Sequence, residues 1–472
     1  MQVFRYSGPE FSPYAEDEVA PLAGDGPWPA PFAKVPLAAS VQLPGSKSLT
    51  NRELVLAALA NGPSLLRRPL HSRDSALMIE ALRALGVSIE EVAGDGLFGP
   101  DLLVTPGELE GGSSIDCGLA GTVMRFMPPV AALALGPVSF DGDPHARNRP
   151  MRTVIDALRA LGVDVSDDGR GALPFSLYGT GAIEGGSLEI DASASSQFVS
   201  GLLLAAPRFE KGLTLRHTGE HLPSMPHIEM TIECLAARGV VVDSPEPGVW
   251  VVPHTDIQAL DVDIEPDLSN AAPFLAAAIV AGGSVSISGW PASTTQVGAH
   301  LETLLPLFGA TSTRRGDSLV IDGGDGVRGG GQLPGVDIDL SIGGELAPAI
   351  VAVAALASGP SRITGIGHLR GHETDRLAAL AAEINGLGGD VAELDDGLAI
   401  TPAPLHGGEW KSYEDHRMAT AGAIIGLAVP GVLVDDIATT AKTLPQFPAL
   451  WAELVQDPDE VVTTVTTDTL LL

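Results

Sequence analysis

A lysine, several hydroxyls and an arginine stand together in the segment LPGSKSLTNR, residues 43–52. The chain has only five lysines, so a lysine beside these hydroxyls and this arginine is notable. A turn followed by apolar residues predicts a helix that Ser46 or Ser48 would cap. A helix start with free N–H groups and two cations suits a phosphate or carboxylate. A capped helix with a solvated lysine is the alternative, and the spacing is not that of a Walker loop.

Further cations stand beside predicted helix starts. The segment CGLAGTVMR, residues 117–125, would bring backbone N–H groups and Arg125 close to an anion, although a structural glycine turn explains it equally well. Three arginines, Arg147, Arg149 and Arg152, lie within six residues. Their density favours a bound anion over a solvated face, with a salt-bridge cluster as the alternative.

Hydroxyls and acids mark other helix starts. Ser195 and Ser196 precede an apolar run, where capping is their usual role. The segments GHETDRL, residues 371–377, and YEDHRMA, residues 413–419, each combine a histidine, acids and an arginine. Such groups suit acid–base chemistry beside an anion, and surface ion pairs would explain either segment alone.

The composition restricts the function. The net charge is -32, with 59 acidic and 27 basic residues, which argues against nucleic acid and anionic membranes as partners. An anionic ligand therefore needs the few cations gathered in one place. The cysteines, Cys117 and Cys234, are too few for a disulfide framework and fit a cytoplasmic location. Seven prolines in residues 1–36 predict an extended leader.

An internal repeat organises the rest of the chain. Amphipathic helical patterns end on a glycine at intervals of 76, 77, 70 and 79 residues, at Gly86, Gly162, Gly239, Gly309 and Gly388. Each glycine should end its helix in a left-handed conformation. With a sixth helix at 447–454, and strand-like runs between the helices, the pattern predicts an α/β (α+β) protein of six units. Two lobes of three units would leave a ligand cleft between them.

The motifs in their order resemble those of the 5-enolpyruvylshikimate-3-phosphate synthase family. They are LPGSKSLTNR, LAGTVMR, RNRP, SSQF, PSMP, GHETDR, EDHRMA and TAKTLP, spread from about Val41 to Trp451. The resemblance implies the two-lobed enolpyruvyl transferase fold, with three βαβαββ units in each lobe. It implies a lobe one formed by residues 37–46 and 266–458, a lobe two formed by residues 47–265, and an active site in the cleft between them.

The resemblance also implies an activity. The enzyme would transfer the enolpyruvyl group of phosphoenolpyruvate to the 5-hydroxyl of shikimate 3-phosphate, and inorganic phosphate would leave through a tetrahedral ketal intermediate. This is a step of the shikimate pathway of aromatic amino acid biosynthesis. It requires no metal and no organic cofactor. We expect a cytoplasmic monomer whose partners are these two small molecules.

The resemblance implies roles for single residues. Glu345 would accept the proton of the attacking hydroxyl, and Glu373 would work with Lys47 in proton transfer at the methylene carbon. The phosphoenolpyruvate-binding residues would be Lys47, Gly121, Arg125, Arg149, Gln197, Arg376, Arg417 and Lys442. The shikimate 3-phosphate-binding residues would be Ser48, Arg52, Ser195, Ser196, Gln197, Ser224, Glu345 and His372.

Several positions depart from the family pattern: Leu119, often asparagine; His145, often arginine; His227, often tyrosine; and His372, often lysine. Glu345 is one methylene longer than the usual aspartate. Because His372 can lose its charge near neutral pH, we expect shikimate 3-phosphate binding to weaken as the pH rises through neutrality. Gly121 is the small residue that leaves room for glyphosate in the family, so we expect sensitivity to this herbicide.

Two alternatives remain at this point. UDP-N-acetylglucosamine enolpyruvyl transferase shares the fold and the donor, but its reactive loop carries a cysteine that residues 143–150 lack. A non-catalytic anion-binding scaffold is the second alternative. The combination of Lys47, Glu345 and Glu373 argues against it.

Overall fold

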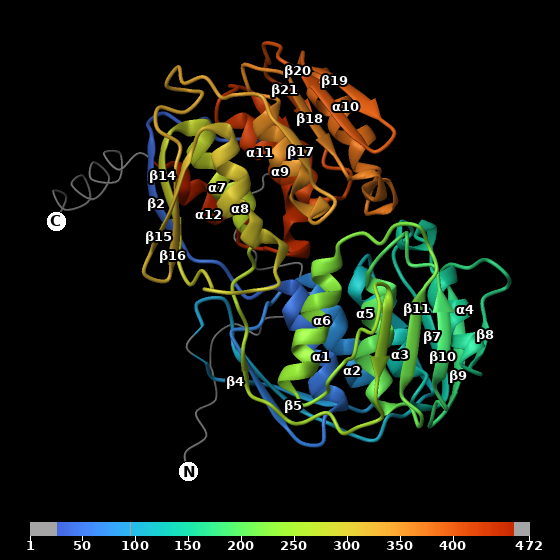
Figure 1. The fold of residues 1–472 in the computed structure, drawn as a ribbon. Helices are drawn as coiled ribbons and strands as arrows, with labels where there is room; N and C mark the ends of the chain where they lie inside the picture. The colour runs from blue at the N-terminus through green and yellow to red at the C-terminus, as the bar shows by residue number, and fades with distance from the viewer. Residues whose placement is uncertain (1–25, 95, 457–472) are drawn as a thin grey trace.

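The computed structural model describes residues 26–94 and 96–456 and has two lobes, one above the other in Figure 1. Each lobe has its own buried hydrophobic core. The core of lobe one includes residues between 30 and 43 and between 268 and 454, and the core of lobe two lies between 54 and 257. Burying one leucine, isoleucine or phenylalanine contributes about 1.5–3 kcal/mol, so each lobe has ample apolar area for a stable core. The predicted mixed α/β class is confirmed.

Within the described residues, lobe two has three sheets on the outside of its helices, with the strand orders β13-β3-β5-β4, β6-β7-β9-β8 and β10-β11-β12. Its strands are β3 (Ser64–Arg67), β4 (Ser88–Val92), β5 (Asp101–Thr105), β6 (Ser113–Asp116), β7 (Leu135–Asp141), β8 (Asp164–Ser166), β9 (Phe175–Thr180), β10 (Gly186–Ile190), β11 (Leu213–His217), β12 (Val249–Val252) and β13 (Val262–Asp263). Its helices are α1 (Lys47–Leu59), α2 (Arg73–Ala84), α3 (Gly121–Ala131), α4 (Arg152–Ala160), α5 (Gln197–Ala205) and α6 (Met225–Ala237).

Lobe one, as far as the chain is described, also has three sheets, with the orders β15-β16-β14-β2, β17-β18-β20-β19 and β1-β22-β21. Its strands are β1 (Trp28–Pro29), β2 (Leu37–Val41), β14 (Gly283–Ile287), β15 (Thr311–Arg315), β16 (Ser318–Asp322), β17 (Asp337–Asp339), β18 (Ser361–Thr364), β19 (Asp390–Leu394), β20 (Gly397–Thr401), β21 (Gly408–Trp410) and β22 (Val432–Val434). Its helices are α7 (Ala271–Ala281), α8 (Leu301–Leu304), α9 (Ala347–Ala354), α10 (Arg376–Gly386), α11 (His416–Gly426) and α12 (Phe447–Val455).

The sheets repeat one topology. In the sheet of β6, β7, β8 and β9, the first two strands are parallel and the last two form an antiparallel hairpin, in the chain order β6-α3-β7-α4-β8-β9. This is the βαβαββ unit expected from the sequence. Other units vary this order. The first unit of lobe two takes its first strand from β13, at the end of the lobe, and lobe two is inserted between β2 and β14 of another unit. The third unit has only a single bridge, Asp243 to Val251, opposite β12, and the sixth borrows β1 as the antiparallel partner of β22.

The borrowed strand lies in the predicted leader. Trp28 and Pro29 pair with Val434 and Leu433, and the Ala30 N–H donates to the carbonyl of Val432 at 3.0 Å. Ala33 is fully buried in the core of lobe one. The described part of the predicted leader, residues 26–36, is therefore packed onto lobe one, while residues 1–25 lie outside the described residues.

The repeat glycines have the predicted backbone conformation. Gly86, Gly162, Gly239, Gly309 and Gly388 have φ between 81° and 96°, just beyond the helices that they end. A side chain there would be strained, because left-handed φ values are disfavoured for residues with a Cβ. Local backbone chemistry thus accounts for the glycine repeat that was visible in the sequence.

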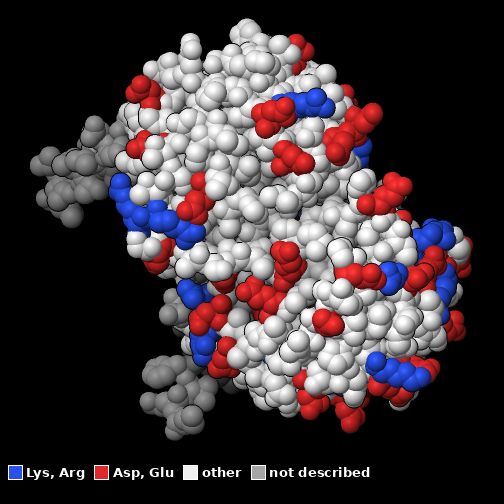
Figure 2. Space-filling model, viewed as in Figure 1, with Lys and Arg blue, Asp and Glu red and all other residues white. Residues whose placement is uncertain are grey.

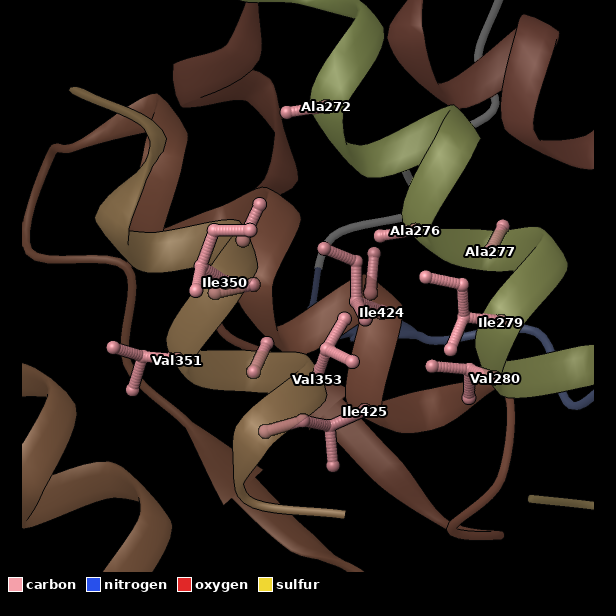
Figure 3. Packing of buried hydrophobic residues seen from close by; sticks show 14 of the residues in the cluster. Ala272, Ala276, Ala277, Ile279, Val280, Ile350, Val351, Val353, Ile424 and Ile425 are labelled. Atoms are coloured by element: carbon pink, nitrogen blue, oxygen red, sulfur yellow. The ribbon is translucent and has the colours of Figure 1, made fainter. Parts of the chain in front are cut away.

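Three buried helices form the centre of each lobe. In lobe two, α1, α3 and α5 contact one another, and in lobe one α7, α9 and α11 do the same. Figure 3 shows the second group: Ile424 of α11 lies next to Ala276 of the alanine-rich α7, and Val353 of α9 lies beside Ile424. Small alanine side chains allow these helices to approach closely. The remaining helices and the sheets surround these centres, so the central helices can expose only their ends.

The chain passes between the lobes twice, and the two passing segments are hydrogen-bonded to each other. The Ser46 N–H donates to the carbonyl of Glu265 at 2.7 Å, and the Asp267 N–H donates to the carbonyl of Pro44 at 2.9 Å. β2, before the first crossing, pairs with β14 of lobe one. Lys47 and α1 therefore begin at the junction of the two lobes.

Candidate active site

A cavity that opens to solvent lies between the lobes, and its empty space, with the open solvent included, is about 1000 Å³. Central helices of both lobes contribute the residues at their starts: Lys47 of α1, Gly121 of α3 and Gln197 of α5 from lobe two, and Asn270 before α7 and Arg417 of α11 from lobe one. The N-terminus of a helix carries unpaired N–H groups and a partial positive charge. Several such ends around one cavity make it attractive to anions.

Most of the predicted site residues line this cavity. They are Lys47, Ser48, Gly121, Arg125, Arg149, Ser195, Ser196, Gln197, Ser224, Glu345, His372, Glu373, Arg376 and Arg417. Arg52 and Lys442 do not line it. The fold thus gathers, in one cavity, residues that are more than 350 positions apart in the chain.

The cavity differs in charge from the outer surface. On the face shown in Figure 2, acidic side chains are spread over both lobes, and basic ones lie in small groups beside them. Several exposed arginines are paired with acids, as Arg314 is with Glu302 at 2.8 Å. The cations of the cavity are the ones that the sequence analysis expected to gather at a single anion site.

Arg125 and Arg149 have unused hydrogen-bonding capacity. Arg125 is 3% and Arg149 is 9% exposed, and within the described part of the chain the Nε of each has no hydrogen-bond partner. A Cβ on Gly121 would lie 3.2 Å from the Nη1 of Arg125, the Nη2 of Arg149 and the Oε1 of Gln197. Burial lowers the pKa of Arg125 well below its ordinary value, and Arg149 adds to this. An anion at this place would satisfy both guanidinium groups.

The other two arginines of the 147–152 group do not join them. Arg147 donates to Asp141 through Nε at 2.9 Å and through Nη2 at 2.8 Å, as an exposed ion pair. Arg152 reaches the carbonyl of Gly169 at 3.4 Å. Of the three arginines, only Arg149 lines the cavity, whereas Arg147 forms the kind of salt bridge that the sequence analysis kept as the alternative.

Glu373 is held by two cations. Its Oε1 accepts from the Nζ of Lys442 at 2.5 Å, and its Oε2 accepts from the Nη2 of Arg376 at 3.1 Å. Burial would raise the pKa of this carboxyl, but the two cations together hold it well below its ordinary value. Burial also lowers the pKa of Lys442. Lys442 therefore lies behind Glu373, in contact with the cavity residue rather than with the cavity.

Lys47 forms an ion pair with a residue that the sequence analysis did not choose. Its Nζ donates to the Oδ2 of Asp74 at 3.2 Å, and its backbone N–H donates to Asp267 at 3.1 Å. Asp74 is 1% exposed, and its Oδ1 has no partner within the described residues. That Lys47 works with Glu373 in proton transfer stays a prediction. In the structure, Lys47 is paired with Asp74, and Glu373 is paired with Lys442 and Arg376.

Arg52 is a buried residue that touches the site indirectly. It is 1% exposed, and its guanidinium donates to the hydroxyl of Thr231 at 2.8 Å and to the carbonyls of Ser48 and His227, each at 2.9 Å. Burial lowers its pKa to about 10. Its role as a shikimate 3-phosphate ligand stays a prediction, because its donors face protein groups.

Glu345 is held from both lobes. Its Oε1 accepts from the hydroxyl of Ser269 at 2.5 Å, and its Oε2 lies 3.0 Å from the Nε2 of His227. Burial would raise the pKa of Glu345, but His227 and Arg417 hold it well below its ordinary value. An ionised carboxylate in a cavity can accept a proton.

The pKa of His372 is shifted away from neutrality. Burial is the main cause that holds its pKa well below 6.5, and the nearby charge of Arg376 acts in the same direction. Its Nδ1 lies 3.4 Å from the Nη1 of Arg376. The direction of this pKa shift disagrees with a charge change near neutrality in the protein without ligand. The weakening of shikimate 3-phosphate binding with rising pH stays a prediction.

The sequence analysis missed several residues of the cavity and its support. His416 lines the cavity, is 3% exposed, and within the described residues neither ring nitrogen has a hydrogen-bond partner. Its motif was quoted, but only its neighbour Arg417 was chosen. Asp74 and Ser269 stand in ordinary helix-start sequences, so nothing in their local pattern marks them. Asp415 was visible in the same motif as His416 and anchors Arg376 through Nε at 2.7 Å.

Comparison with solved structures shows that the two-lobed fold of repeated units is the enolpyruvyl transferase fold. The fold is similar to that of EPSP synthase from Acinetobacter baumannii, with a TM-score of 0.73 and 24% identity over 90% of this chain and 97% of that one. It is also similar to the enolpyruvyl transferase NikO from Streptomyces tendae, with a TM-score of 0.69 and 18% identity over 90% and 97%.

Within that class, the chain belongs to the EPSP synthase (3-phosphoshikimate 1-carboxyvinyltransferase) family, whose sequence model matches residues 33–451. It is 59% identical over 439 residues to the 3-phosphoshikimate 1-carboxyvinyltransferase of Kocuria rhizophila, a match that covers 92% of this chain and 97% of the relative. The family resemblance stated from the motifs is confirmed. None of the helices in residues 26–94 and 96–456 has the length and apolar character needed to cross a bilayer.

Proposed function

We propose a division of the cavity between the two substrates of the family reaction. As a member of this family, the chain transfers the enolpyruvyl group of phosphoenolpyruvate to the 5-hydroxyl of shikimate 3-phosphate and releases inorganic phosphate. The observation that carries the proposal is the grouping of two low-pKa carboxylates, Glu345 and Glu373, with the arginines of one cavity. Cations bind the anionic groups of both substrates, and carboxylates move protons.

Phosphoenolpyruvate is assigned to the cation side. Arg125 and Arg149 have unused donors around the small Gly121, and Arg376 and Arg417 line the same cavity. Arginine suits a substrate with both a phosphate and a carboxylate, because its planar guanidinium can donate two parallel hydrogen bonds. Lys442 contacts Glu373 on this side of the cavity. Lys47 and Gln197 are the remaining residues that we assign to phosphoenolpyruvate.

Shikimate 3-phosphate is assigned to the hydroxyl-rich side of lobe two. Ser195 and Ser196 stand at the start of α5, and Ser224 stands at the start of α6 with a left-handed φ of 52°. Serine hydroxyls and the free N–H groups of a helix start suit a phosphate without adding charge. Ser48 and His372 line the same cavity, and Arg52 reaches it through the carbonyl of His227.

The chemical steps follow from the carboxylates. Protonation of the methylene carbon of phosphoenolpyruvate, with Glu373 and Lys47 handling the proton, leaves positive character on the adjacent carbon. The 5-hydroxyl attacks that carbon as Glu345 takes its proton, which gives the tetrahedral ketal. Loss of a proton from the methyl group and departure of inorganic phosphate restore the double bond. General acid–base groups of this kind contribute about 10²–10⁴-fold each.

Glu345→Gln tests the assigned base, because it keeps the shape of the side chain and removes the charge. We expect turnover, measured as phosphate release with both substrates, to fall by about 10²–10⁴-fold while the KM for phosphoenolpyruvate stays within a few-fold. Glu184→Gln, in an exposed pair with Lys211, is the matched control and should keep wild-type turnover. Full turnover of Glu345→Gln would remove the base role from this residue.

We also propose the lobe boundaries stated above, at residues 46 and 266, and a monomeric, cytoplasmic enzyme. The pairing of β2 with β14, and of β13 with β3, supports the boundaries. The monomeric state is carried over from the expectation in the sequence analysis. Light scattering after size-exclusion chromatography tests it, and a mass twice that of the chain would contradict it.

A further inference from the structure

One ion pair at the cavity joins the two lobes. The Nε2 of His227, on α6 of lobe two, lies 3.0 Å from the Oε2 of Glu345, which precedes α9 of lobe one. The two side chains are 12% and 16% exposed, so solvent screens the pair only in part. Ser269 of lobe one occupies the other carboxylate oxygen at 2.5 Å. The carboxylate is therefore fixed by one donor from each lobe.

We propose that His227 is the positioning residue of the general base. It orients the Glu345 carboxylate, so the ability of Glu345 to accept a proton depends on contact between the lobes. This inference rests on the proposed role of Glu345. His227 is not itself assigned a proton in the reaction. It acts through Glu345, by holding one of the two carboxylate oxygens.

The length of the side chain explains why such a device is needed. A glutamate has one more rotatable bond than an aspartate, so it loses more rotamer freedom when it is fixed in a single geometry. Ser269 alone would leave the carboxylate free to swing about its bond to that hydroxyl. A second donor on the other oxygen fixes the plane of the carboxylate, which sets the direction of its lone pairs toward a hydroxyl in the cavity.

His227 is itself held firmly. Its carbonyl accepts hydrogen bonds from the Nη2 of Arg52 at 2.9 Å, from the hydroxyl of Thr231 at 2.9 Å and from the hydroxyl of Ser200 at 3.3 Å. These donors lie on α1, on α6 and on α5, and two of these helices, α1 and α5, belong to the centre of lobe two. The inference therefore gives buried Arg52 a part in the site that needs no direct contact with substrate: it helps to fix the backbone that carries the imidazole.

The charges around the pair decide what removal of His227 would do. Arg417, Arg52, Arg376 and His368 also face Glu345 or His227. Against the effect of burial, His227 is the largest cause that lowers the pKa of Glu345, followed by Arg417. Without His227, fewer positive charges would counteract the effect of burial, and the pKa of Glu345 would rise.

His227→Phe and His227→Gln, measured beside His406→Phe, test the inference. His406 is an exposed histidine that does not line the cavity. We expect His227→Phe to lower kcat about tenfold or more at pH 7 and to move the acid limb of kcat up by about one pH unit, with the KM for phosphoenolpyruvate nearly unchanged. His227→Gln keeps a donor without a titrating ring and should lie between wild type and His227→Phe, while His406→Phe should match wild type.

A merely structural role would lower kcat without moving the acid limb. An acid limb at the same pH in wild type and His227→Phe overturns the inference, and so does wild-type kcat in that variant. If His227→Phe does not fold, the acid limb of His227→Gln decides, because an unshifted limb there also overturns the inference. Substrate phosphates titrate equally in all variants, so differences between variants belong to the protein. If Glu345→Gln loses activity but His227→Phe keeps the wild-type kcat and acid limb, only the inference about His227 is overturned. If Glu345→Gln keeps full activity, the proposed base role of Glu345 is overturned as well.

Discussion

Arg376 and Asp415 form a bidentate ion pair, in which Nε lies 2.7 Å from Oδ2 and Nη2 lies 3.1 Å from Oδ1. The side chains are 2% and 0% exposed. Burial alone would lower the pKa of Arg376, but Asp415 and Glu373 raise it above its ordinary value. The pair thus keeps a cavity arginine charged and fixed, and it joins the starts of α10 and α11.

Removal of one partner from this pair should be costly. Asp415→Ala leaves a buried guanidinium with one carboxylate fewer and removes the N-cap of α11, so we expect a loss of about 3–5 kcal/mol in the free energy of unfolding. Urea denaturation measures it. Glu184→Ala, which breaks an exposed pair with Lys211, is the control and should leave the midpoint unchanged. Equal midpoints for both variants would show that the buried pair does not stabilise the fold.

Gly121→Ala should weaken donor binding. The added methyl would lie 3.2 Å from Arg125, Arg149 and Gln197, which is tighter than an ordinary contact. Overpacking of about 1–3 kcal/mol should raise the KM for phosphoenolpyruvate about tenfold and reduce inhibition by glyphosate. Gly386→Ala, where a Cβ has no atom within 4 Å, serves as the control. An unchanged KM in Gly121→Ala would place the donor elsewhere.

The pH dependence of acceptor binding should lie below neutrality. Because the pKa of His372 is held well below 6.5, this residue is neutral from about pH 7 to about pH 9, and the KM for shikimate 3-phosphate should be flat in that range. Protonation at lower pH adds a positive charge and should tighten binding relative to His372→Gln. A KM that rises several-fold between about pH 6.5 and about pH 8 in wild type, but not in His372→Gln, would restore the expectation drawn from the sequence.

Glu373 should contribute an acid-sensitive part of stability. Its folded-state pKa is depressed, so its contribution is present above the ordinary value of 4.5 and is lost as the pH falls through the lower folded pKa. Glu373→Gln should be less stable than wild type at pH 7, and its free energy of unfolding should fall less between about pH 5 and about pH 3. Urea titrations at several pH values measure this. Parallel curves for the two proteins would mean that Glu373 does not titrate with a depressed pKa.

Local chemistry made much of the fold predictable. The repeat glycines have to end their helices with positive φ, so the spacing of Gly86 and Gly162 along the chain indicates the length of one unit. The ordered motifs identified the family and most of the cavity. β1 was not predictable, because Trp28 and Pro29 pair with residues about 400 positions away and their own sequence is rich in proline.

Side-chain partners were harder to predict than positions. Lys47 and Asp74 meet because α1 and α2 pack together, and no spacing rule relates residues on two helices. The lowered pKa of His372 depends on its burial and on the charge of Arg376. Neither effect can be read from the sequence. The separate directions of Arg147 and Arg149 depend on a turn whose geometry is set by contacts outside the segment.

The choice of acceptor tests the central claim most directly. Phosphate release from phosphoenolpyruvate should be measured with shikimate 3-phosphate and, separately, with UDP-N-acetylglucosamine. The cavity between the lobes predicts release with the first acceptor, one phosphate for each enolpyruvyl group transferred, and none with the second. No release with shikimate 3-phosphate, or equal release with UDP-N-acetylglucosamine, would contradict it.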